Sequence, residues 1–191
     1  MQNFTGGYGV VVDGPYTPDF SMWNAVKDSI KLTDYSYAPA KAQKVLEDGG
    51  WVYNSKGEAY VAGQKGVDSV RYKKLEGDAL NKVNMNYKSV ANTDGTEYKT
   101  VNVNGVYYMP LVINWFGTSG NSVTELLTTS LANSQDLPTI GMVVRATVGD
   151  FTTLLGNIYR EASYGYSGTP TYGMFNLATG WNVSMQDEAF R

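Results

Sequence analysis

The order of the apolar segments between residues 111 and 178 constrains the fold of this chain more than any other feature. A compact apolar run is followed by a helical pattern, an alternating strand pattern, a second helical pattern and a short strand. Strands joined through helices lie parallel in one sheet, and such crossovers are right-handed. The sequence therefore predicts an α/β fold with a mixed sheet and a parallel βαβαβ core. The predicted elements are a strand at 111–116, a helix at 121–133, a strand at 140–148, a helix at 151–161 and a strand at 172–178.

Both predicted helices of this core carry a start signal and an apolar stripe. Ser122 and Glu125 have the S-x-x-E spacing of a capping box, and Asp150 is placed to cap the second helix. Val143 falls on the second face of the strand at 140–148, which indicates that both faces of the sheet are partly covered. The predicted inward stripes are Val123, Leu126, Leu127 and Leu131 in the first helix, and Phe151, Leu154, Leu155, Ile158 and Tyr159 in the second.

A further helix is predicted within residues 36–51. Pro39 suits the first turn of a helix, where the backbone N–H groups have no intrahelical partner. The pair Gly49 and Gly50 ends the helix, because glycine adopts the left-handed cap conformation without a Cβ penalty. The predicted buried face consists of Ala42, Val45 and Leu46.

Residues 52–110 form a polar, loop-prone stretch with short β-prone pieces. Asn104 and Gly105 are the strongest hairpin signal, because both residues tolerate the positive φ of a type I′ turn. We therefore expect a strand on each side of this turn. At 191 residues the chain fits a single domain, and 52–110 is a polar loop and hairpin insertion within it. The turn-rich opening of the chain indicates a piece of a longer protein.

The composition excludes several classes of function. The chain has 191 residues, a net charge of −3, and neither His nor Cys. Thiolate nucleophiles, imidazole bases and the usual zinc ligands are thereby absent, and we expect no metal and no cofactor. The chain has no excess of Lys and Arg that would neutralise the phosphates of a nucleic acid. No apolar run is long enough to cross a bilayer, and we expect any export signal to lie outside this chain.

Ligands of open α/β sheets bind beyond the carboxyl ends of the strands, so the loops at those ends are the candidate site. The first loop contains Thr118, Ser119 and Gly120, and it either offers backbone N–H groups to an anion or is a structural turn. Trp181 follows the last predicted strand, beside Asn182 and Ser184. Its indole either forms an apolar wall of a cleft or closes the end of the sheet as a core residue.

Several blocks of the sequence resemble the family 5 extracellular solute-binding proteins, the peptide and nickel binders of ABC importers. The pattern Tyr-x-Pro-x-Lys-Ala-x-x-x-Leu-x-x-x-Gly-Trp at residues 37–51 resembles an alignment block of their C-terminal lobe. GGYGVVVDGPYTPDF, NSKGEAY and the span from MPLVINWF to MFNLATGW resemble further blocks, in the family's order.

This resemblance implies that the chain is most of the C-terminal lobe of a type II periplasmic-binding-protein-like fold. Such a protein would be extracellular, either periplasmic or lipid-anchored, and non-enzymatic. Its expected partners are a peptide or other small solute, the missing N-terminal lobe and the ABC permease subunits. Peptide-binding relatives carry an acidic residue at the position of Ser184, with Asp187 farther on here. In those relatives the acidic residue captures the α-amino group of the peptide, so the departure at Ser184 leaves a blocked peptide, an oligosaccharide or another solute open as the ligand.

Two other classes of function remain open from the sequence. Fifteen tyrosines and four tryptophans suit a stand-alone carbohydrate-binding module with an aromatic stacking surface, and a tyrosine-rich surface equally suits peptide recognition. A hydrolase that uses only carboxylates would need two acids facing one cleft. The acids considered for that role are Asp13, Asp19, Asp34, Glu125, Asp150 and Asp187, of which Glu125 and Asp150 are expected to act as helix caps.

Overall fold

The computed structural model describes residues 6–8, 21–33, 36–77, 90–91, 95–120, 122–166 and 173–175. The chain divides into two units, one of Met1–Ala38 with Ala178–Arg191 and one of Pro39–Leu177. The described part of the first unit holds helix α2 (Ser21–Val26) and the 3₁₀ turn η1 (Lys27–Ser29). The interpretation of residues 1–191 as one lobe stays a prediction. No helix of the described residues is long and apolar enough to cross a membrane.

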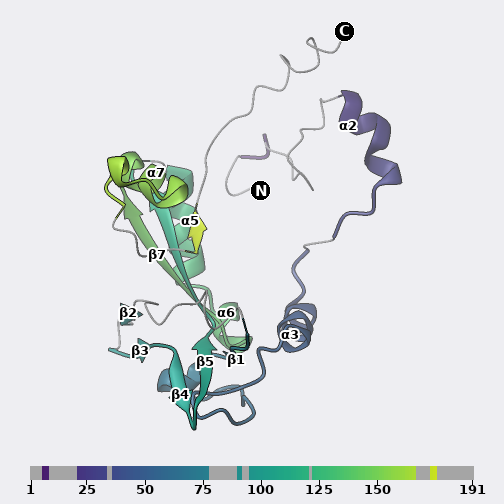
Figure 1. The fold of residues 1–191 in the computed structure, drawn as a ribbon. Coiled ribbons are helices and arrows are strands. Elements are labelled where there is room, and N and C mark those ends of the chain that lie inside the picture. Colours follow the sequence, from purple (N-terminus) through teal and green to yellow (C-terminus); the bar gives the residue numbers. More distant parts are fainter. Residues whose placement is uncertain are drawn as a thin grey trace. The chain divides into compact units, whose positions relative to one another are not determined.

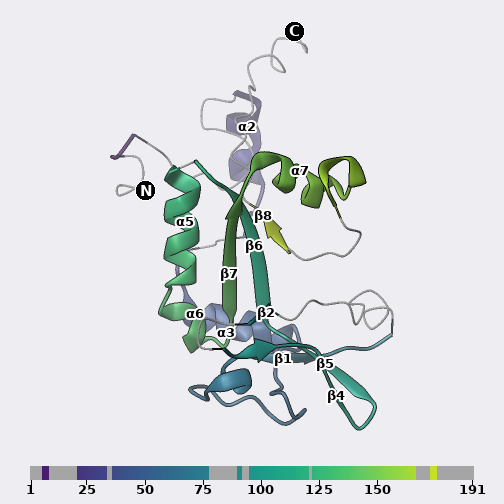
Figure 2. The same ribbon diagram turned by 90° about the vertical axis from the view of Figure 1, so that its left-hand side faces the viewer.

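The second unit contains the predicted parallel core (Figure 1). Strand β6 (Val112–Thr118) lies between β7 (Val143–Gly149) and β8 (Met174–Phe175), and it pairs in parallel with both. Helix α5 (Ser122–Ala132) connects β6 to β7, and helix α7 (Phe151–Tyr159) follows β7. Figure 2 shows α5 and α7 on opposite sides of the β6–β7 pair. The predicted strand–helix–strand–helix–strand order is confirmed.

The predicted inward stripe of α5 is wrong in part. Leu126 is 44% exposed, whereas Thr124 and Thr128 are buried. The reason is Gly117 in β6, where an added Cβ would lie 2.6 Å from the Thr124 methyl group. The strand and the helix therefore approach too closely at this point for a leucine. The Thr128 hydroxyl donates to the Thr124 carbonyl at 2.9 Å, which satisfies its buried polar atom.

The start of α5 also differs from the predicted capping box. Ser122 is the first residue of the helix, so it does not cap the helix from outside. Glu125 does reach back, but its carboxylate accepts from the backbone N–H of Gly120 at 3.2 Å. In α7 the predicted cap is confirmed, because Asp150 accepts from the backbone N–H of Thr153.

Helix α7 buries only the middle of its predicted stripe. Leu154 is fully buried, and Leu155 and Ile158 are partly buried. Phe151 and Tyr159, at the two ends of the helix, are both more than half exposed, which corrects their predicted inward position. The nine-residue helix thus contacts the sheet through its central turn.

Two antiparallel sheets precede the parallel core. The first has the order β1-β5-β4, and the second pairs β2 with β3. Asn104 and Gly105 have φ values of 52° and 85°, which confirms the predicted turn between β4 and β5. A cluster of buried side chains fills the core of this region, namely Val70, Tyr72, Tyr98, Tyr108 and Val112. The strands are β1 (Tyr72–Lys74), β2 (Val90–Ala91), β3 (Glu97–Tyr98), β4 (Val101–Val103) and β5 (Val106–Pro110).

Helix α3 (Pro39–Asp48) begins and ends as predicted. Its C-terminus has the hydrogen bonds of a Schellman motif, from Gly50 N–H to the Glu47 carbonyl and from Trp51 N–H to the Leu46 carbonyl, both at 2.9 Å. Its predicted buried face is only half-buried, and Val45 is 61% exposed. The remaining elements of the second unit are the 3₁₀ turns η2 (Gly66–Ser69) and η3 (Ala162–Tyr164) and the short helix α6 (Asp136–Thr139).

Candidate functional site

The carboxyl ends of the parallel strands form the candidate site, here called the strand-end edge. It comprises residues 117–120 at the end of β6, residues 148–151 from the end of β7 to the start of α7, and Glu125 of α5. Strand β7 is added on one side of β6 and the later strand β8 on the other side, so the order in which strands are added reverses at β6. Ligands of doubly wound sheets bind beyond the carboxyl ends of the strands at such a point. Thr118 lies opposite Gly149 in the register. The two loops therefore lie side by side.

Internal hydrogen bonds hold the loop after β6. The backbone N–H of Ser119 donates to the Gly149 carbonyl at 2.7 Å, and the backbone N–H of Gly120 donates to the Glu125 carboxylate at 3.2 Å. Both predicted anion donors thus already have acceptors within the protein. The side-chain hydroxyls of Thr118 and Ser119 make no hydrogen bond to another described residue, and they are the groups left for a ligand.

Gly149 fixes the spacing between the sheet and the loop that leads to α7. A Cβ at this position would lie 2.5 Å from the ring of Phe116, which is itself buried. Asp150 follows, and the Thr153 hydroxyl and backbone N–H both donate to its carboxylate, at 2.6 and 2.9 Å. These hydrogen bonds lower the pKa of the Asp150 carboxyl, so it stays ionised as a helix cap.

The structure brings together only part of the predicted site. Thr118, Ser119 and Gly120 lie at the strand-end edge, whereas Trp181, Asn182 and Ser184 lie outside the described residues.

Sequence reasoning missed two apolar side chains at the same edge. Val148 is 41% exposed and Phe151 is 55% exposed. Periodicity alone places both on buried faces. The sequence signal that could have indicated their exposure was their position, at the end of a strand and in the first turn of a helix.

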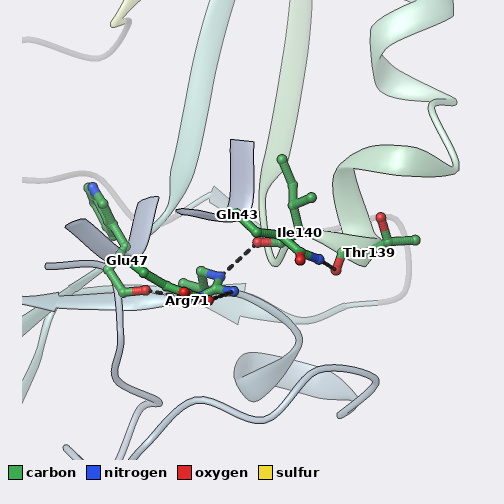
Figure 3. Close-up of polar contacts among 6 residues, drawn as sticks. Gln43, Glu47, Arg71, Thr139 and Ile140 are labelled. Carbon is green, nitrogen blue, oxygen red and sulfur yellow. Dashed lines mark hydrogen bonds and ion pairs between the residues drawn. The ribbon is translucent and has the colours of Figure 1, made fainter. Parts of the chain in front are cut away.

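A second polar constellation, the Arg71 joint, was not predicted. It consists of Arg71 with Glu47, Trp51, Tyr60, Ile140 and Gly141. Arg71 is only 6% exposed, and each of its guanidinium nitrogens donates a hydrogen bond (Figure 3). The acceptors are the Ile140 carbonyl at 2.9 Å, the Trp51 carbonyl at 3.0 Å and the Glu47 carboxylate at 3.1 Å. The joint therefore ties α3 and β1 to the turn before β7.

Close packing completes the Arg71 joint. The guanidinium carbon lies 4.6 Å from the centroid of the Tyr60 ring, within the range of a cation–π contact. A Cβ at Gly141 would lie 2.7 Å from both the Arg71 side chain and the Tyr60 hydroxyl. Burial raises the pKa of Tyr60, and the neighbouring Arg71 charge opposes that shift. Since the guanidinium is enclosed and its nitrogens have acceptors, the joint is structural.

The described residues contain no group of three or more Asp, Glu, His or Cys side chains that could hold a metal ion. The two acids at the strand-end edge, Glu125 and Asp150, both accept hydrogen bonds from backbone N–H groups near the start of a helix. The groups that the edge offers to a ligand are thus hydroxyls and apolar side chains.

No protein-family model matches this chain, and no curated protein matches its sequence. Among solved structures, the oligopeptide-binding protein from Thermus thermophilus, complexed with a pentapeptide, is similar over 76% of this chain and 23% of that chain. The identity is 18% and the TM-score is 0.32. This chain therefore spans less than a quarter of the length of that protein. A likeness at this level establishes neither a shared family nor a shared ligand, whereas the chain's own sheets and helices establish its mixed α/β fold class.

Proposed function

We propose that this chain is the C-terminal lobe portion of a family 5 solute-binding protein, which captures an extracellular peptide-like solute for an ABC importer. The observation that carries the proposal is a coincidence of sequence and structure. The sequence block from MPLVINWF to MFNLATGW, which resembles the family, covers the observed order β6, α5, β7, α7 and β8. The protein would belong to the extracellular or cell-surface compartment, periplasmic or lipid-anchored.

In this proposal the ligand lies against the strand-end edge, between this lobe and an N-terminal lobe. Thr118 and Ser119 contact it through their hydroxyls, because the backbone N–H groups of Ser119 and Gly120 have internal acceptors. Trp181, Asn182 and Ser184 supply the remaining contacts, and the exposed Val148 and Phe151 add apolar surface. Closure of the two lobes around the solute presents the protein to the permease subunits.

The protein acts by binding and not by catalysis in this proposal. A carboxylate-only hydrolase needs two carboxyl groups that face one substrate. At the strand-end edge Glu125 and Asp150 are engaged with the backbone N–H groups of Gly120 and Thr153. A carbohydrate-binding module is also not favoured, because the parallel sheet with a helix on each side differs from the β-sandwich expected for such a module.

A ligand panel tests the proposal on the full gene product. Thermal shifts and fluorescence titrations would be measured with free peptides, N-acetylated peptides and oligosaccharides. We expect a peptide to raise the melting temperature and to change the tryptophan fluorescence. The fluorescence change should be lost in Trp181→Phe and kept in the matched control Trp51→Phe. If no peptide shifted the melting temperature, the proposed function would be wrong.

A further inference from the structure

The turn between β4 and β5 carries the only Asn-Gly pair of the chain, Asn104 and Gly105. Both residues are exposed to water. The Asn104 carboxamide makes no hydrogen bond to another described residue, so its carbon is open to attack. Gly105 has no side chain to hinder ring closure. The turn therefore combines an unprotected side-chain amide with a following residue that has no side chain.

One contact restrains this chemistry. The backbone N–H of Gly105 donates to the Asn102 side-chain oxygen at 2.9 Å. The nitrogen must lose this proton before it can attack, and the hydrogen bond holds the proton in place. Asn102 is thus positioned to set the rate at which the neighbouring pair reacts.

Asn54 shows the opposite arrangement within the same unit. Its side-chain oxygen accepts from the backbone N–H groups of Lys56 and Glu58, at 2.9 and 3.0 Å. The following nitrogen, that of Ser55, donates to the Asp68 carboxylate at 2.9 Å. In this Asn-Ser pair the side-chain amide and the following backbone nitrogen are both hydrogen-bonded. In the Asn104-Gly105 pair only the backbone nitrogen is hydrogen-bonded.

The geometry points to a spontaneous modification site: Asn104 deamidates in the folded protein, at a rate that the Asn102 side chain controls. The Gly105 nitrogen forms a bond to the Asn104 side-chain carbon, the bond from that carbon to the amide nitrogen breaks, and ammonia leaves with the Gly105 proton. Water then opens the cyclic imide to aspartate or isoaspartate. No oxidant or reductant takes part.

The modification would act on the core through β4. Val103 pairs with Val106 on either side of the turn, and Val101, Val103 and Val106 pack against the buried cluster around Tyr72 and Tyr108. Isoaspartate lengthens the backbone inside the turn, so it disturbs this pairing. Either product also adds one negative charge, which makes the modified protein separable by ion exchange.

The full chain would be incubated at mildly alkaline pH, digested, and analysed by mass spectrometry for a gain of one mass unit at Asn104. We expect the product in the folded wild type, and a rate at least several-fold higher in Asn102→Ala. Asn102→Asp keeps an oxygen acceptor, so its rate should stay near that of the wild type. Asn54 provides the internal control and should stay unmodified over the same period.

The Asn102→Ala substitution could act either by removing the acceptor or by loosening the hairpin. Val101→Ala is the control for the second effect, because it weakens β4 and keeps Asn102. Circular dichroism would verify that every variant is folded. No product at Asn104 in the folded wild type would overturn the site. A rate in Asn102→Ala equal to that of the wild type, or equal to that of Val101→Ala, would overturn the control by Asn102.

Discussion

The Arg71 joint and the strand-end edge lie in the same unit, but they satisfy their polar groups in different ways. In the joint, one buried guanidinium reaches acceptors at sequence separations of 20, 24 and 69 residues. At the edge, the carboxylates of Glu125 and Asp150 bind backbone N–H groups only five and three residues away. Long-range contacts hold the joint together, whereas the edge combines short-range caps with one contact between neighbouring strands, from Ser119 N–H to the Gly149 carbonyl.

This difference assigns the Arg71 joint to the stability of the protein and the strand-end edge to binding. The joint encloses its charged group and offers nothing to a ligand. The edge keeps two hydroxyls and two exposed apolar side chains after its backbone groups are satisfied. We therefore expect substitutions in the joint to unfold the protein, and substitutions at the edge to alter what it binds.

The largest effect is expected for Arg71→Met. The change leaves the buried carbonyl of Ile140 and the partly buried carbonyl of Trp51 without their donors, and each buried unsatisfied group costs about 1–3 kcal/mol. Urea unfolding should show a loss of about 3 kcal/mol or more in the free energy of unfolding. Glu47→Gln is the matched control. The Glu47 side chain is half exposed, so its ion pair should contribute less than about 1 kcal/mol. Equal losses in the two variants would contradict the central role of Arg71.

A smaller effect is expected for Gly149→Ala at the edge. The new methyl group would meet the ring of Phe116, and such overpacking costs about 1–3 kcal/mol. Gly173→Ala is the control, because no atom of the described residues lies within 4 Å of a Cβ at that position. Its unfolding free energy should stay within about 0.5 kcal/mol of the wild type. If Gly149→Ala behaved like the control, the sheet and the loop would not be in close contact at Phe116.

Asp150→Ala should lower the urea midpoint slightly, because α7 loses its N-cap. The effect should depend on pH. The folded pKa of Asp150 is lowered, so its contribution is complete above the unfolded pKa and is lost as the pH falls through the folded pKa. The difference between wild type and variant should therefore shrink in acid. Asp150→Asn keeps an acceptor for Thr153 and should lose mainly the pH dependence. A difference that stayed constant down to strongly acidic pH would contradict the capping role of the charge.

The smallest effect on stability is expected for Ser119→Ala. Its exposed hydroxyl makes no hydrogen bond to another described residue, so the unfolding free energy should stay within about 0.5 kcal/mol of the wild type. Affinity for a peptide found in the ligand panel should fall, as measured by titration of the full gene product. Thr129→Ala, an exposed position on α5, is the control and should leave affinity unchanged. Unchanged affinity in Ser119→Ala would remove this loop from the proposed site.

The sequence predicted most of the fold but little of the site. The strand–helix order, the Asn104-Gly105 turn and the Asp150 cap are all set by residues close together in the chain. The inward stripe of α5 could not be predicted, because its close approach depends on Gly117 in the strand before it. The strand-end location of residues 118–120 followed from the topology. The hydrogen bond of the Ser119 N–H could not be predicted in this way, because its acceptor, the Gly149 carbonyl, lies in the next strand.

By itself, the sequence determined the order of the elements and several of their ends, because caps and turns depend on hydrogen bonds between near neighbours. Pro39 at the start of α3 and Gly50 at its end are examples. Only the tertiary structure decided which faces are buried, leaving Val45 and Leu126 exposed and Thr124 and Arg71 enclosed. The physical reason is that burial depends on the shape and the unpaired polar groups of distant segments. A carbonyl such as that of Ile140 becomes the partner of Arg71 only when folding brings the two together.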